Sequence, residues 1–182
     1  MGEMSSVKKS IITAVCIALC VVLPMAFHSV QNAGRIFMPM QIPVLLCGLI
    51  CGWRFGILCG LLGPLLSSFV TGMPPMPLLP SMVAELSAYG LVAGISTRIV
   101  RSGTLLADIY ISLAVAMVVG RIVAGVLRAL IFSSGGYSIA AWMASYFVTA
   151  LPGLILQIIL IPSIMAALES AGLIPRRYPR SR

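Results

Sequence analysis

Charged side chains are scarce in this sequence. They make up 9% of its 182 residues, and only four of them are acidic, whereas a soluble domain has roughly 25% charged residues. Hydrophobic residues reach 60%, with a mean hydropathy of +1.10. This balance excludes a soluble globular domain and indicates an integral membrane protein. The net charge of +8 is explained below by membrane orientation and needs no nucleic acid partner.

Catalytic and metal-binding motifs are missing as well. The sequence contains one histidine and neither an H-E-x-x-H nor a G-x-S-x-G motif, which argues against an intramembrane enzyme. It also lacks a G-x-x-x-x-G-K-[ST] phosphate-binding loop, so an ATP-driven cycle would need ATPases from partner subunits. The five cysteines form no C-x-x-C pair, and we expect them to pack as small hydrophobic residues. We therefore expect no metal site and no cofactor.

What the sequence has instead is long apolar segments. Since about 20 apolar residues span a bilayer, these segments predict an all-α integral membrane protein. We expect a compact bundle of six transmembrane helices in one domain, residues 1–182, with short tails at about 1–9 and 172–182. The second and third helices are short, and a tight turn at Trp53, Arg54 and Phe55 is expected between them. The expected helices cover approximately residues 11–27, 41–53, 55–71, 80–97, 105–131 and 140–168.

Basic residues indicate how these helices are oriented. The first segment follows Lys8 and Lys9 as a signal peptide would, but apolar segments continue along the chain, so we read it as a retained helix. Six crossings place most basic residues on one side, which the positive-inside rule assigns to the cytoplasm together with both termini. Arg35, Arg121 and Arg128 do not fit this pattern. The residues that do are Lys8, Lys9, Arg54, Arg98, Arg101, Arg176, Arg177, Arg180 and Arg182.

A run of prolines separates the third and fourth helices. The segment Gly72, Met73, Pro74, Pro75 and Met76 cannot continue a helix, because proline removes a backbone donor and restricts the residue before it. An ordinary solvated turn would explain the prolines but would not need the apolar methionines. We therefore predict a stiff lid over a cavity on the outer side, with Gly72 as a hinge.

Three blocks of the sequence resemble a known transporter family. The blocks are "AVCIALCVVLPMAFH", "IFMPMQIPVLLCGLICGWRFGILCGLLGPLLSSFVTGMPP" and "PSMVAELSAYGLVAG", and the family is the substrate-binding S components of energy-coupling factor (ECF) vitamin transporters. The resemblance implies a prokaryotic plasma-membrane protein that binds a vitamin near its extracellular face, under the first and third connecting loops. It also implies docking on a transmembrane scaffold subunit that is driven by two cytoplasmic ATPases.

Two further positions bear on this resemblance. Ala14 and Ala18 match the family's A-x-x-x-A docking signature on the first helix, so we expect them to contact the scaffold rather than only to pack inside the bundle. Gln41 departs from the family pattern, in which a histidine stands within "PMHIPV". No role of that histidine is therefore carried over to this chain.

Polar side chains inside the membrane are costly, which makes each of them a candidate for binding the ligand. Glu85, Arg121 and Arg128 are expected to share the outer half of the bundle. Tyr89 follows Glu85 by four residues and so lies on the same helix face. The full set of ligand-binding candidates is Asn32, Arg35, Glu85, Tyr89, Arg121, Arg128, Trp142, Tyr146 and Gln157.

These charges allow two interpretations. Glu85 and one arginine could form a structural ion pair; alternatively, at least one arginine faces the cavity and binds a carboxylate or phosphate through its planar guanidinium. Two cations against one acid favour an anionic ligand. Among the vitamins that the family resemblance implies, pantothenate is the first candidate, with folate, niacin, cobalamin and pyridoxine-type compounds behind it. A stand-alone secondary carrier or channel is the alternative function, and it predicts transport by this chain alone without ATP.

Overall fold

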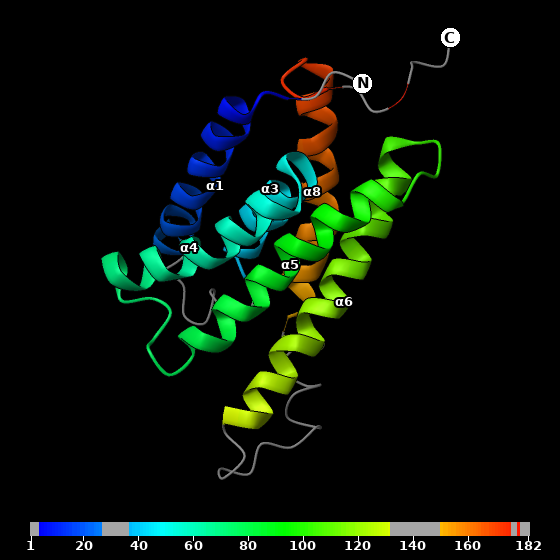
Figure 1. Ribbon diagram of the computed structural model, residues 1–182. Coiled ribbons are helices and arrows are strands. Elements are labelled where there is room, and N and C mark those ends of the chain that lie inside the picture. The colour runs from blue at the N-terminus through cyan, green and yellow to red at the C-terminus, as the bar shows by residue number, and fades with distance from the viewer. Residues whose placement is uncertain (1–3, 27–36, 132–149, 176–177, 179–182) are drawn as a thin grey trace.

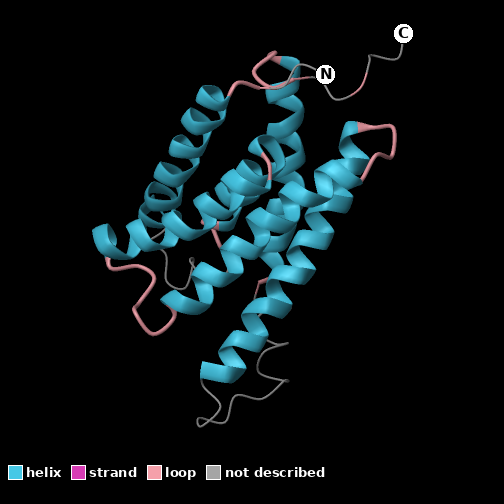
Figure 2. Cartoon of the chain, in the orientation of Figure 1, coloured by secondary structure: helices cyan, strands magenta, loops and turns pink. Residues whose placement is uncertain are grey.

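The chain folds into a bundle of helices in the computed structural model, which describes residues 4–26, 37–131, 150–175 and 178 (Figures 1 and 2). Within those ranges there are six helices and no strand, as the all-α prediction requires. Five of the six are long and apolar enough to cross a membrane, whereas the remaining one, α3, has 11 residues. The helices are α1 (Ser6–Ala26), α3 (Gln41–Cys51), α4 (Trp53–Thr71), α5 (Leu79–Ile99), α6 (Leu105–Ile131) and α8 (Leu151–Ser170).

The short helix α3 lies at the centre of the bundle. It contacts each of the other five described helices, and ten of its 11 residues are buried. A helix that is enclosed on all sides must be apolar all round, which explains the apolar sequence that follows Gln41. Because longer helices surround α3, its own length does not have to match the thickness of a bilayer.

Glycines let α4 and α5 cross in direct backbone contact. A Cβ atom at Gly56 would collide with the backbone of Gly90, and one at Gly90 would collide with the backbone of Gly56. Small residues bring helix backbones together in this way within membranes, where no hydrophobic force draws one helix to another. The crossing holds α5, which carries Glu85 and Tyr89, in a defined position.

Successive helices alternate in direction, which brings several helix ends together. The end of α3 lies beside the start of α1, where the Cys51 thiol donates a hydrogen bond to the Lys9 carbonyl at 3.7 Å. Arg98 near the end of α5 and Arg54 at the start of α4 line a cavity with Lys9. In Figure 1 the end of α8 is at this same end, at the top of the view. We call it the basic end; its orientation toward the cytoplasm stays a prediction.

The predicted turn between the second and third helices is wrong in its position. The helix α4 already begins at Trp53, so the break lies at Gly52 and not at Trp53, Arg54 and Phe55. Gly52 has a φ of 92°, a left-handed value that glycine adopts without steric cost. A single residue therefore turns the chain from α3 into α4.

The predicted last helix is also wrong in its extent. An unbroken helix over residues 140–168 was expected, but Ala150 lies in a turn and α8 begins at Leu151. Pro152 explains this start, because proline is favoured in the first turn of a helix and cannot donate the N–H of a later turn. Residues 140–149 lie outside the described ranges.

Candidate functional site

Five polar side chains from four helices meet inside the bundle. Gln41 begins α3, Glu85 and Tyr89 lie on α5, Arg121 on α6 and Gln157 on α8. All five residues are buried, and at most 5% of the surface of each residue is exposed. We call this group the polar cluster. Burying so many polar groups in an apolar bundle is costly unless they bind one another or a ligand.

Hydrogen bonds join four of these side chains. The Gln41 amide donates from Nε2 to Oε1 of Glu85 at 3.3 Å, and the Tyr89 hydroxyl donates to the same oxygen at 2.9 Å. Gln157 in turn donates from Nε2 to Oε1 of Gln41 at 2.9 Å. The carboxylate of Glu85 is thus the acceptor toward which this network points.

The orientation of the two amides follows from their partners. Gln41 turns its NH₂ group toward Oε1 of Glu85, which also accepts from Tyr89, and it turns its oxygen toward Gln157. Gln157 must then use its own NH₂ group to reach Gln41. This leaves the buried Oε1 of Gln157 without a hydrogen-bond donor among the described residues. The polar cluster therefore offers an acceptor for a further donor.

The ring of Tyr89 is held by the helix that carries Arg121. A Cβ atom at Gly120 would collide with the Tyr89 ring, so glycine at that position lets α6 approach α5 closely. Arg121 follows directly, and its guanidinium is near enough to the Tyr89 side chain to interact with it electrostatically. The cation is 2% exposed, so little solvent screens its charge.

The structure thus brings together four of the residues predicted from the sequence, namely Glu85, Tyr89, Arg121 and Gln157. The contact of Glu85 with Tyr89 confirms that they share one face of α5. Gln41 was not among the predicted ligand-binding residues, although it links Glu85 to Gln157. Its one sequence signal was a polar residue at the start of an otherwise apolar run.

Other predicted residues cannot be placed at the site. Arg128 belongs to α6, two turns after Arg121, but its side chain is not among those described. The part of Arg128 in ligand binding therefore stays a prediction. The same holds for the predicted residues that lie outside the described ranges. The predicted residues outside the described ranges are Asn32, Arg35, Trp142 and Tyr146.

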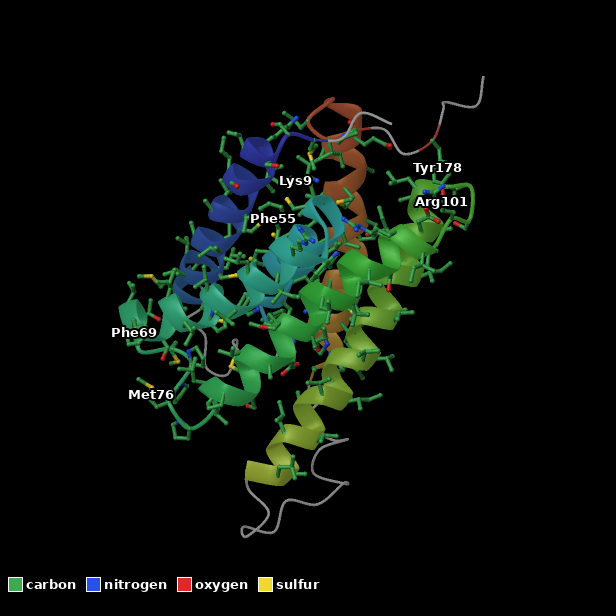
Figure 3. The ribbon with its side chains drawn as sticks, in the orientation of Figure 1. Lys9, Phe55, Phe69, Met76, Arg101 and Tyr178 are labelled. Atoms are coloured by element: carbon green, nitrogen blue, oxygen red, sulfur yellow. The ribbon has the colours of Figure 1, made fainter. Side chains whose placement is uncertain are left out.

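The predicted lid begins at a glycine in the left-handed conformation, and its role as a hinge stays a prediction. Gly72 has a φ of 73°, and its N–H bonds to the carbonyl of Ser68. The Ser68 hydroxyl donates to the Pro74 carbonyl at 2.9 Å, which folds the segment back on α4. Pro74 is buried, whereas Met73 and Met76 are 41% and 62% exposed. Figure 3 shows Met76 at the end of the bundle opposite Lys9.

The predicted docking residues lie on the exposed side of α1. Ala14 and Ala18 are exposed, whereas the buried residues of this helix are Thr13, Cys16 and Cys20. Two small side chains one turn apart leave a flat strip that another helix could approach closely. Docking through this strip stays a prediction.

Two cavities lie away from the polar cluster. One of about 420 Å³ opens at the basic end, and one of about 300 Å³ is an apolar hollow on α6 beside Val115 and Val118. The predicted pocket under the first and third loops involves residues 28–36, which lie outside the described ranges.

Comparison with known proteins gives one match. The model of a family described as "ECF transporter, substrate-specific component" matches residues 8–165, which is most of the chain. That region includes every member of the polar cluster and the exposed strip of α1. No curated protein and no solved structure matches the chain.

Proposed function

Because the chain belongs to the family of substrate-specific (S) components of ECF transporters, we propose that it binds its substrate at the polar cluster. As an S component it is a transport subunit without catalytic activity and a multi-pass protein of the prokaryotic plasma membrane. The observation that carries the proposal is the burial of Gln41, Glu85, Tyr89, Arg121 and Gln157 at one place in an apolar bundle. Packing alone gives no reason to collect them there.

The ligand in this proposal is a small anion. The planar guanidinium of Arg121 suits a carboxylate or phosphate, and its burial strengthens the attraction. The spacing of seven residues between Arg121 and Arg128 in the sequence predicts a second cation on the same face of helix α6. Glu85 is the one acid in the cluster, so together these residues leave a surplus of positive charge.

The acceptor on Gln157 narrows the choice of ligand. Since its Oε1 is buried and receives no hydrogen bond from the described residues, a ligand hydroxyl or amide N–H would stabilise it. A small carboxylate that also carries hydroxyl and amide groups meets both requirements. Pantothenate is therefore our first candidate, with folate, niacin, cobalamin and pyridoxine-type compounds behind it.

Uptake requires the other subunits of the ECF transporter. In our proposal the strip at Ala14 and Ala18 docks on the transmembrane scaffold, and two cytoplasmic ATPases drive the cycle, since this chain has no phosphate-binding loop. The loops at the far end, including the lid from Gly72 to Met76, would close over the bound vitamin. When the chain alone is reconstituted in liposomes, the vitamin should not accumulate inside them. Accumulation without the scaffold subunit, the ATPases and ATP would favour a stand-alone carrier.

Ligand identification followed by calorimetry tests the binding site. Mass spectrometry of small molecules that co-purify with the protein should find an anionic vitamin. Arg121→Ala should weaken binding of this vitamin by roughly 2 to 5 kcal/mol, as for a desolvated charge pair. Arg121→Lys should recover only part of the lost affinity, because lysine lacks the planar guanidinium group. Arg101→Ala is the control, since Arg101 is exposed and lies outside the polar cluster. A neutral ligand that binds Arg121→Ala with undiminished affinity would refute the anion site.

A further inference from the structure

The cavity at the basic end collects cations from three different helices. Its volume is about 420 Å³, and it is lined by Lys9 of α1, Arg54 of α4 and Arg98 of α5, together with Trp53 and Phe55. Figure 3 marks this region with Lys9 and Phe55. Residues so far apart in the sequence meet only because the helices alternate in direction. The substrate site proposed above does not use this cavity.

The positive charge of this cavity is not neutralised from within. Its lining among the described residues contains no aspartate or glutamate. The guanidinium of Arg54 lies over the Trp53 ring, 5.2 Å from the ring centre. Such stacking orients an arginine through its face and leaves the N–H groups at its edge for an anion.

The start of α4 lies at the same cavity. Trp53, Arg54 and Phe55 form its first turn, and Gly52 before them provides no side-chain cap. The N–H of Gly56 is bonded to the Gly52 carbonyl at 3.0 Å, and the three residues between them line the cavity. A helix N-terminus attracts anions through its dipole and its N–H groups. The end of α3 at Cys51 lines the same cavity with a dipole of the opposite sign, so it is the three cations that make the cavity suited to an oxyanion such as a phosphate.

We propose that this cavity binds the phosphate of an anionic phospholipid headgroup. Apolar side chains adjoin the lining on the outside of the same helices: Val7 is 70% exposed on α1, and Ile99 is 75% exposed next to Arg98. The acyl chains of a lipid would cover these surfaces, from which a free phosphate ion would gain nothing. Tryptophan with lysine and arginine at helix ends is also the composition of a membrane interface, and basic pockets between such helices bind lipid headgroups.

Lipid titration followed by native mass spectrometry tests the proposal. The full-length protein, purified in neutral detergent and delipidated, is titrated with phosphatidylglycerol, phosphatidylcholine or inorganic phosphate. Phosphatidylglycerol should bind at least tenfold more tightly than phosphatidylcholine, and inorganic phosphate should not displace it at millimolar concentration. Arg54→Gln/Arg98→Gln should weaken phosphatidylglycerol binding at least tenfold.

A matched double variant separates a site from general attraction. Lys8→Gln/Arg101→Gln also removes two charges, one from an exposed residue in the first turn of α1 and one from an exposed residue just after α5. Neither residue lines the cavity, so binding should change less than threefold. Equal losses in both double variants would overturn the site. Displacement of phosphatidylglycerol by inorganic phosphate would show that the cavity binds a soluble anion, and it would overturn the proposal of a lipid ligand. If Arg54→Gln/Arg98→Gln does not fold, Arg98→Gln compared with Arg101→Gln decides by the same measurement.

Discussion

The helices α1 and α3 are both apolar, but they bury their residues to opposite degrees. Only Thr13, Cys16 and Cys20 are buried among the 21 residues of α1, whereas α3 buries ten of 11. One consequence is that α1 presents Ala14 and Ala18 to the outside, while α3 contacts every other described helix and brings Gln41 into the polar cluster. Hydrophobicity places both helices in the bundle, but burial separates the proposed docking surface on α1 from the proposed binding site.

The largest effect is expected at the docking surface. Ala14→Trp or Ala18→Trp should abolish assembly with the ECF scaffold, because a bulky ring prevents close approach of another helix. Ligand affinity should stay within a few-fold of wild type, since both residues are exposed. Co-purification with the scaffold and calorimetry measure the two properties.

The control for these variants is another tryptophan on α1. Leu19→Trp changes an exposed residue on a different sector of the helix and should leave assembly intact. Loss of ligand binding in Ala14→Trp, equal to its loss of assembly, would show that this face packs inside the protein.

A smaller effect is expected at Gln41 of α3, and it should fall on stability or ligand affinity instead of on assembly. Gln41→Leu removes a donor to Glu85 and the acceptor for Gln157, which should cost about 1 to 3 kcal/mol in stability or ligand affinity. Assembly with the scaffold should persist, because Gln41 is buried away from the exposed strip of α1. Gln41→His should recover part of the loss, since a neutral imidazole both donates and accepts.

Thermal unfolding and calorimetry on the same preparations separate the two costs. Ile42→Leu is the matched control at the next buried position, where a volume-conserving change should cost less than about 1.5 kcal/mol. If Gln41→Leu binds the ligand and unfolds like wild type, the hydrogen-bond network contributes nothing to the site.

How much of this arrangement could be predicted depends on the range of the interactions. The apolar runs predicted the helices, and the four-residue spacing predicted the contact between Glu85 and Tyr89, because both follow from local geometry. The role of Gln41 could not be predicted, since its partners Glu85 and Gln157 lie 44 and 116 residues away. Only the packing of α3 between α5 and α8 brings them together.

Backbone conformation limited the prediction in a second way. A periodic apolar pattern runs through Gly52 without a signal that its φ is positive, so the turn was placed at Trp53, Arg54 and Phe55 and not at Gly52. The proline run after α4 gave a clear signal, and Gly72 does end that helix in a left-handed conformation. A strong chemical constraint is thus easier to recognise than a single glycine among many.

The smallest effect is expected at the lid. The double variant Met73→Ala/Met76→Ala should speed ligand release a few-fold, because less apolar surface would cover the vitamin once the segment closes. Hydrogen exchange over residues 72–79 should slow when ligand is added to the wild-type protein. Leu173→Ala, an exposed residue after α8, serves as a control. If neither the rate of ligand release nor the rate of hydrogen exchange changes, the segment is an ordinary turn and not a lid.

The central claim is that Arg121 in the polar cluster binds the anionic group of the substrate. A thermodynamic cycle that combines one protein variant with one ligand analogue tests this claim most directly. Calorimetry compares the co-purified vitamin with its neutral alcohol analogue, each with wild type and with Arg121→Ala. The account predicts that removing the ligand's charge weakens binding to wild type by roughly 2 to 5 kcal/mol and has little further effect in Arg121→Ala. An equal loss of affinity in both proteins would contradict the claim, because the ligand's charge would then be recognised elsewhere.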